Sequence, residues 1–255
     1  MASKTSLNPV QLEICAGSVE SVRAAAQGGA DRVELCAALS EGGLTPSHGL
    51  LCAALAETRL RTHVLIRPRG GDFVYSEAEA DAMVRDVEHA RSLGAHGIAI
   101  GALTPAGLLD RPLLQRLIAA ADGMALTFHR AFDLCLNPFQ AIEEIIDLGF
   151  SRLLTSGLAL SAEEGIPTLK RLVAMSAGRL SIMPAAGVSP TNAARILQAT
   201  GAREIHASAR SLRRSAMQPT AAVAKMGASD TDDSAWLETD ASIVANLRAA
   251  IDNMA

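Results

Sequence analysis

The sequence predicts a single α/β domain, a (β/α)8 TIM-type barrel that spans residues 1–255. Eight strand-like stretches alternate with helix-like stretches along the chain, and strict alternation of this kind gives parallel strands joined by crossover helices. The length of 255 residues matches the roughly 250 residues that such a barrel uses. No GxGxxG motif follows the first strand, which disfavours an open dinucleotide-binding sheet.

The predicted strands are short apolar runs bounded by turn residues. The first two alternate apolar and polar residues, and the third, THVLIRPR, ends in a basic stretch. The fourth and seventh are rich in small residues, and the fifth leads into a loop. In order, the strands are predicted at residues 11–16, 31–36, 62–69, 97–103, 124–133, 152–157, 181–187 and 204–210.

The predicted helices show helical periodicity between start and stop signals. The first begins after a Ser18 N-cap and ends at Gly28-Gly29, and the third is acidic and ends at Gly94. Residues 211–238 form an irregular segment, read as a long loop over 211–233, before a last helix with an acidic start. The helices are predicted at residues 19–27, 50–57, 77–94, 111–121, 138–148, 163–176, 190–200 and 239–251.

Composition excludes several classes of protein. A net charge of −4 with scattered arginines gives no basic field for nucleic acid. No apolar run approaches the ~20 residues of a membrane helix, and the first residues lack a secretory segment, so we expect a cytoplasmic protein that does not bind membranes. Four cysteines without a CxxC pair are too few for a disulfide scaffold, which indicates reduced thiols.

One pattern, apolar-Glu-apolar-Cys, occurs twice in neighbouring predicted strands. It is written LEIC at residues 12–15 and VELC at residues 33–36. Alternation along a strand places Glu13, Cys15, Glu34 and Cys36 on one face, opposite the aliphatic residues. Because carboxylates are rarely buried without partners, this face needs cations, protons or a ligand nearby.

The same alternation predicts which polar residues point into the barrel. His63, Arg67 and Arg69 follow from the third strand, and Glu204, His206, Ser208 and Arg210 from the last. Most of these residues fall late in their strands, at the end where barrel enzymes hold their sites. The residues expected at one mouth are Glu13, Cys15, Glu34, Cys36, Arg67, Arg69, His129, Arg130, Asp133, His206 and Ser208.

Three alternatives stay open at this point. Glu13 and Glu34 could neutralise Arg67 and Arg69 as an internal salt-bridge layer without a ligand. The two inward thiols could share a soft metal such as Cu(I) or pack as small buried residues, because barrel shear need not make matching positions level neighbours. Residues 187–190 could bind phosphate at a helix start or form an ordinary turn.

Five segments together resemble the copper homeostasis protein CutC family. They are ELCAALSEGGLTPSHG, IRPRGGDFVYSEAE, TFHRAFD, LLTSG and EIHASAR, and the similarity covers about residues 11 to 210. The resemblance implies a (β/α)8 barrel, a cytoplasmic location, a homodimer or larger homo-oligomer and a role in copper handling. It also implies that Cys15 and Cys36 are the copper(I) ligands. PAAGVS at residues 184–189 is less rich in glycine than the family pattern.

Two hypotheses for function follow, and the sequence does not decide whether the protein is an enzyme. In the first, Cys15 and Cys36 bind Cu(I). In the second, a barrel enzyme acts on a small anionic substrate that could be phosphorylated. Its predicted catalytic residues are Glu34 or His129 as base and His206 as proton donor, and its predicted substrate-binding residues are Glu13, Arg67, Arg69, Arg130, Asp133 and Ser208.

Overall fold

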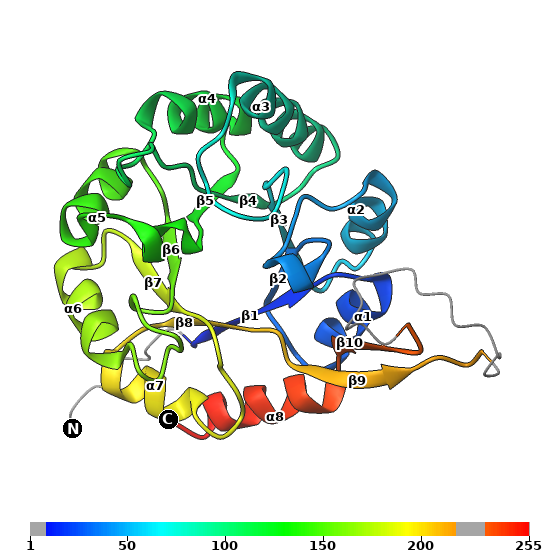
Figure 1. Cartoon of the computed structure of the whole chain (residues 1–255). Helices are drawn as coiled ribbons and strands as arrows, with labels where there is room; N and C mark the ends of the chain where they lie inside the picture. Colours follow the sequence, from blue (N-terminus) through cyan, green and yellow to red (C-terminus); the bar gives the residue numbers. More distant parts are fainter. Residues whose placement is uncertain (1–8, 218–232, 255) are drawn as a thin grey trace.

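The chain forms a ring of eight parallel strands surrounded by helices (Figure 1). The computed structural model describes residues 9–217 and 233–254. The ring strands are β1 (Gln11–Ala16), β2 (Arg32–Leu35), β3 (Arg61–Leu65), β4 (Gly97–Ile100), β5 (Ala125–Phe128), β6 (Arg152–Thr155), β7 (Ser181–Pro184) and β8 (Glu204–Ala207).

Hydrogen bonding joins the strands in the order β7-β6-β5-β4-β3-β2-β1-β8, and every pairing is parallel. The two strands at the ends of this order, β7 and β8, lie side by side and complete the ring (Figure 1). Strands adjacent in sequence are neighbours in space, as short right-handed crossovers require. The predicted TIM-type barrel is confirmed.

The helices cover the outside of the strand ring (Figure 1). The first begins at the predicted Ser18, whose hydroxyl accepts the Ser21 N–H, and the third has a capping box between Ser76 and Glu79. They are α1 (Val19–Gln27), α2 (His48–Leu55), α3 (Glu77–Ser92), α4 (Arg111–Ala121), α5 (Pro138–Asp147), α6 (Ile166–Ser176), α7 (Ala193–Thr200) and α8 (Ala241–Asp252).

Several boundaries differ from the sequence prediction. Strand β3 ends at Leu65 and not at residue 69, because Pro68 lacks the N–H that a ladder needs. Strand β5 ends at Phe128, and a short 3-10 helix, η2 (Arg130–Leu134), follows it. Another 3-10 helix, η1 (Leu39–Glu41), lies in the loop after β2. The polar residues beyond these strand ends therefore take their positions from loops.

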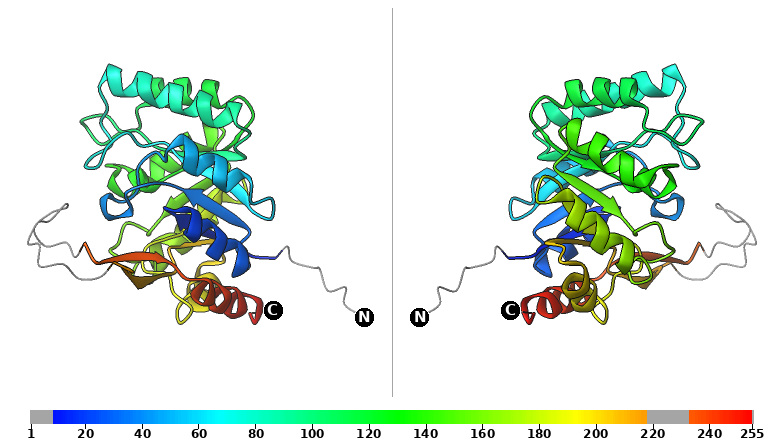
Figure 2. Two further views of the ribbon diagram at one scale, coloured as in Figure 1. Left: turned by 90° about the vertical axis from the view of Figure 1, so that its right-hand side faces the viewer. Right: turned by 90° about the vertical axis from the view of Figure 1, so that its left-hand side faces the viewer.

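The segment 211–238, predicted as irregular, contains regular structure. Strands β9 (Arg210–Arg214) and β10 (Ala235–Thr239) pair antiparallel and extend away from the barrel (Figure 2). The Glu238 carboxylate accepts a hydrogen bond from Ser18, so this hairpin is tied to the start of α1. Residues 218–232 of the predicted loop lie outside the described part of the chain.

The barrel separates apolar from charged residues. Aliphatic side chains of the strands, such as Leu12, Ile14, Val33 and Ile205, are fully buried against the helices. The inward faces of the same strands carry buried charged residues, including Glu13 and Arg32. Hydrophobic burial thus holds the ring together from outside, while the interior is left for polar chemistry. None of the described helices combines the length and apolar character needed to cross a bilayer.

Candidate functional site

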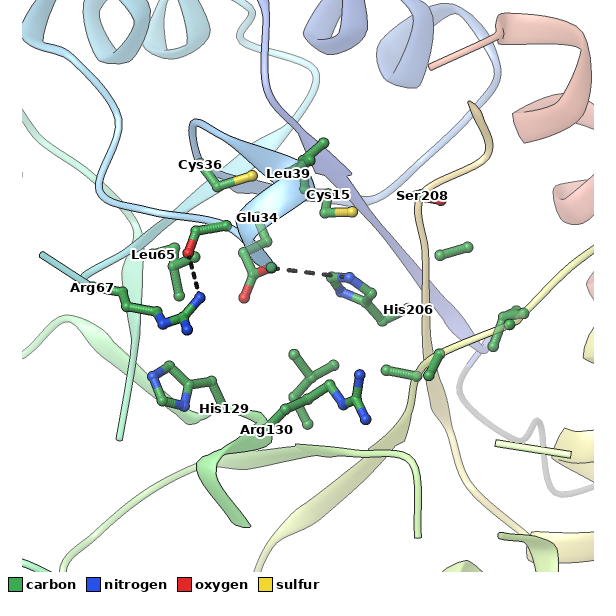
Figure 3. A pocket seen from close by; sticks show the side chains of 18 of the residues that line it. Cys15, Glu34, Cys36, Leu39, Leu65, Arg67, His129, Arg130, His206 and Ser208 are labelled. Atoms are coloured by element: carbon green, nitrogen blue, oxygen red, sulfur yellow. Dashed lines mark hydrogen bonds and ion pairs between the residues drawn. The ribbon is translucent and has the colours of Figure 1, made fainter. Parts of the chain in front are cut away.

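A cavity of about 310 Å³ opens among the C-terminal ends of the barrel strands (Figure 3). This is the end of the barrel where the sequence predicts a site. Of the eleven predicted residues, the cavity wall contains eight: Cys15, Glu34, Cys36, Arg67, His129, Arg130, His206 and Ser208. Arg210 also lines it, together with apolar residues such as Leu39, Leu65 and Phe73. Glu13, Arg69 and Asp133 are placed elsewhere.

Glu13 lies behind His206 as its hydrogen-bond partner. Strands β1 and β8 pair Glu13 with His206 in register, and His206 Nδ1 is 2.7 Å from Glu13 Oε1. The other ring nitrogen, Nε2, lies 4.0 Å from Glu34 Oε2 across the cavity wall (Figure 3). Two carboxylates from β1 and β2 therefore flank one imidazole.

The surroundings give these three groups different protonation. Burial alone would raise the pKa of Glu13, but Arg32 and the hydrogen bond with His206 hold that pKa well below its usual value. Burial is the largest influence on Glu34 and raises its pKa to about 7; the charges of His206 and Arg32 lower that pKa, and the charge of Glu13 raises it further. His206 keeps its proton: burial works against the charge, but hydrogen bonds with Cys15 and Glu13 raise its pKa well above the usual value.

Arg32 is a buried charged residue of the barrel interior that the sequence analysis missed. It is 3% exposed, and its guanidinium pairs with Glu13 from β1 and Glu204 from β8. Glu204 in turn accepts from Arg152 at 2.9 Å. The suggested salt-bridge layer of Glu13 and Glu34 with Arg67 and Arg69 is therefore wrong: Arg32 pairs with Glu13, and His206 is the cation nearest to Glu34 among the ion pairs of the described residues. Arg32 lies two residues before Glu34, so the same strand alternation would have predicted that it points into the barrel.

Arg67 lies in the cavity wall, where backbone carbonyl groups of the loops bind its guanidinium group. Its Nη1 donates to the carbonyl oxygens of Glu41 at 2.7 Å and Gly43 at 3.1 Å, and Nη2 donates to that of Gly71 at 2.8 Å. The Phe73 ring packs against the guanidinium with a centroid distance of 5.0 Å. These contacts fix one orientation of the side chain.

His129 lies beside Arg67 on the cavity wall (Figure 3). Its Nδ1 accepts the Ala131 N–H at 3.2 Å, so the neutral ring carries its proton on Nε2. Burial and the Arg67 charge lower the pKa of His129 to about 3. In this tautomer Nε2 is a donor and is buried without a partner among the described residues, which disfavours the predicted role of His129 as a base.

Two predicted binding residues serve the loops instead of lining the cavity. Arg69 lies beyond the end of β3, where alternation no longer applies, and pairs with Glu79 at 2.6 Å and Asp72 at 3.1 Å. Asp133 lies in η2, and its carboxylate accepts the Ser156 N–H at 3.1 Å and pairs with Arg130 at 2.8 Å. Asp133 thereby connects the loops after β5 and β6 and holds Arg130.

Cys15 and Cys36 both line the cavity but at different heights. Strand pairing sets Cys15 level with Glu34, so Cys36 lies two residues further along β2. The Cys36 thiol is 3.6 Å from the Ala16 carbonyl oxygen, and burial raises its pKa well above the usual value. In residues 9–217 and 233–254, no group of three or more His, Cys, Asp or Glu side chains is placed to hold a metal ion. Two sulfur donors nevertheless suit a soft ion such as Cu(I).

The loop after β7 contributes backbone to the cavity. Gly187 and Val188 line the wall, but α7 begins only at Ala193, three residues later than predicted. Asn192 Oδ1 accepts the Ser189 N–H at 2.9 Å, so this turn satisfies its own donor. The alternative of an ordinary turn therefore describes residues 187–190 better than a helix start that points at the cavity.

Comparison with known proteins assigns the chain to a family. The model of the CutC family matches residues 10–211. A CutC family protein from Chromobacterium violaceum is 52% identical over 241 residues, covering 94% of this chain and 98% of the relative. A human protein described as a copper homeostasis protein cutC homolog is 44% identical over 248 residues, covering 97% and 91%. A crystal structure of CutC from Streptococcus agalactiae superimposes with a TM-score of 0.75 at 33% identity, covering 78% and 98%. The chain belongs to the CutC family.

Proposed function

We propose that the mouth cavity binds a small anionic ligand and transfers a proton to or from it. The carrying observation is the placement of Glu34 within 4.0 Å of the His206 ring, whose other nitrogen is held by Glu13. A carboxyl group with a pKa of about 7 is suited to give and take protons near neutral pH. The copper homeostasis family alone does not require this arrangement.

Each polar residue of the cavity has a role in this proposal. Glu34 is the acid or base, and the protonated His206 stabilises negative charge that develops on the ligand. Glu13 orients His206 and supports its charge. Arg67, Arg130 and Ser208 bind the anion from other sides of the cavity. The reaction class is proton abstraction next to an anionic or carbonyl group, or its reverse.

Isotope exchange tests this proposal without knowledge of the product. The protein is incubated in D2O with a panel of small carboxylates and phosphorylated sugars, and loss of ligand C–H signals is followed by NMR. We expect exchange for a subset of compounds, and we expect Glu34→Gln to abolish it. Arg69→Met is the matched control, because Arg69 pairs with Glu79 outside the cavity. Exchange that persists in Glu34→Gln, or no exchange with any compound, would contradict the proposal.

Cu(I) binding by Cys15 and Cys36 is a second candidate. The favouring observation is that both thiols line one cavity, and a human relative is described as a copper homeostasis protein. Equilibrium competition with a Cu(I) chelator should show weaker binding by Cys15→Ser/Cys36→Ser. The exposed Cys52 gives the control variant Cys52→Ser, which should leave the affinity unchanged. Equal affinities for all three proteins would contradict this candidate.

We also infer a cytoplasmic location and a homo-oligomer. The cysteines at 15, 36, 52 and 135 are all free thiols, which supports a reducing compartment. Three leucines in loops at the mouth, Leu134, Leu136 and Leu160, are 61%, 66% and 89% exposed, which supports a contact with another copy. Cell fractionation tests the first inference. Light scattering of the wild type against Leu134→Ser/Leu136→Ser tests the second, and a monomeric wild type would contradict it.

A further inference from the structure

Three exposed side chains form a cluster on the outside of the barrel, where the neighbouring helices α2 and α3 meet (Figure 1). His48 and Cys52 belong to α2, and His89 belongs to α3. His48 Nε2 lies 3.5 Å from the sulfur of Cys52, and His48 Nδ1 lies 3.0 Å from His89 Nε2. One imidazole ring therefore contacts a thiol through one nitrogen and a second imidazole through the other.

The backbone brings these side chains together. His48 and Cys52 are four residues apart in α2, so they share one face of that helix. The N-cap Ser47, whose hydroxyl accepts the Leu50 N–H, fixes the turn that carries His48. His89 lies in the last turn of α3, with its ring centroid 5.1 Å from that of His48. The contacts thus follow from helix spacing and from the packing of two successive helices of the barrel.

The two contacts of His48 suit it to act as a base toward Cys52. When His48 Nδ1 donates to His89 Nε2, the lone pair on His48 Nε2 faces the thiol and can take its proton. After that transfer, Nε2–H donates to the thiolate while Nδ1–H still donates to His89, so neither contact is lost. A nucleophile, a base and a group that orients the base stand in the same order in enzymes with an activated cysteine or serine.

Cys52 is also the cysteine that solvent reaches most readily. It is exposed, whereas Cys15 and Cys36 are buried and Cys135 is half-buried. We infer that Cys52 is a modification site, a thiol activated by His48 that exchanges with small-molecule disulfides. All three residues of the cluster lie outside the mouth cavity, so the site is separate from the proposed proton-transfer site.

The exchange balances without a further reactant. The sulfur of Cys52 attacks one sulfur of the small disulfide while His48 Nε2 takes the thiol proton. A bond forms between Cys52 and that sulfur, the original S–S bond breaks, and the leaving thiolate receives the proton from His48. Cys52 is oxidised to a mixed disulfide, and the other half of the small molecule is reduced to a thiol.

The expected product is a mixed disulfide and not an internal one. Among the described residues, which include all four cysteines, Cys15 and Cys36 lie in the cavity wall and Cys135 directly follows η2. Cys52 on the outer helix α2 therefore has no neighbouring thiol with which to close a disulfide. The small molecule stays attached until an external thiol removes it.

Site-resolved reaction rates test the base. The reduced protein is incubated at pH 7 with oxidised glutathione in metal-free buffer, and mass spectrometry of peptides follows mixed-disulfide formation at each cysteine. We expect Cys52 to react fastest and His48→Leu to slow it by about fivefold or more, because an unassisted thiol is only a few per cent thiolate at this pH. Cys36, which is fully buried, should stay unmodified and so shows that each variant is folded. A Cys52 rate in His48→Leu within about twofold of the wild type would overturn the inference.

Two variants of His89 test its role in positioning His48. His89→Gln keeps a side-chain oxygen that can accept from His48 Nδ1, so Cys52 should react at close to the wild-type rate. His89→Leu removes the acceptor, and the rate should fall toward that of His48→Leu. Equal rates in the two His89 variants would contradict the orienting role. Glu34→Gln, which alters the proposed proton-transfer site, should leave the reaction of Cys52 unchanged, so each proposal can fail without the other.

Discussion

Glu13 and His206 lie 2.7 Å apart at the centre of the barrel, although 193 positions separate them in the chain. The contact joins the first strand to the last, and Arg32 holds the second oxygen of the same carboxylate. Glu13 is thus shared between a cation that never titrates near neutral pH and one whose protonation matters for the site. Its replacement should therefore affect stability and chemistry together.

Stability should depend on pH through Glu13 in the acid range. The pKa of Glu13 is lower in the folded protein than its usual 4.5, so the unfolded chain takes up the proton first as the pH falls. The stabilisation from this carboxylate is complete above about pH 5 and is lost progressively below that value. Urea denaturation of the wild type and Glu13→Gln at pH 7, 5 and 3.5 should give a difference that shrinks with acidity. A difference that stays constant would contradict this prediction.

Glu34→Gln should have the opposite pH dependence. The pKa of Glu34 is raised to about 7, so between pH 4.5 and 7 the folded protein keeps a proton that the unfolded chain loses. Wild-type stability therefore falls as the pH rises through this window, whereas the glutamine does not titrate. We expect the variant to gain about 1 to 3 kcal/mol relative to the wild type between pH 5 and pH 8. Equal differences at both pH values would show that Glu34 ionises normally.

Arg32→Met should be strongly destabilising. Arg32 is buried between Glu13 and Glu204, and its removal leaves carboxylates with too little positive charge nearby. Breaking a buried pair in this way costs about 3 to 5 kcal/mol. Arg23→Met is the matched control, because its pair with Glu20 is exposed at 67% and 65% and is worth at most about 1 kcal/mol. Thermal or urea unfolding measures both, and similar losses would rule out the structural role of Arg32.

Two glycine-to-alanine changes should have opposite signs. In Gly101→Ala the new Cβ would lie 2.5 Å from His129 Cε1, so the ring must move, at a cost of about 1 to 3 kcal/mol. In Gly49→Ala the Cβ meets nothing within 4 Å, and the change lies inside α2, so it should stabilise by about 0.5 kcal/mol. Unfolding midpoints give the stabilities, and the NMR signal of His129 should shift only in Gly101→Ala. An unmoved signal there would contradict the packing argument.

Local rules predicted much of this molecule because strands and helices are set by short-range patterns. Period-two alternation placed Glu13, Glu34 and His206 inside the barrel, and all three are buried there. The rule failed where the strand itself ended. Arg69 was assigned to the mouth by extending β3 four residues past Leu65, although Pro68 already signalled the end of the ladder.

The hydrogen-bond and ion-pair partners of these side chains were harder to predict than the face of the strand on which they lie. Glu13 was expected to need a cation, but the choice between Arg32 and Arg67 depends on barrel shear, which a single sequence does not reveal. Likewise, the tautomer of His129 follows from one backbone contact with Ala131 inside η2, a turn that was predicted as strand. Contacts fixed by loops or by register over long sequence separations lie beyond local pattern rules.

The ion pairs of Arg32 with the first and the last strand bear on how the chain folds during synthesis. A ribosome releases Glu13 and Arg32 well before it releases Glu204 and His206. Until Glu204 is made, Arg32 has only Glu13 as a counter-ion, and burying the arginine away from water would cost free energy. We expect the nascent chain to keep its first strands hydrated and to close the ring in a single late event, when the eighth strand brings the missing carboxylate.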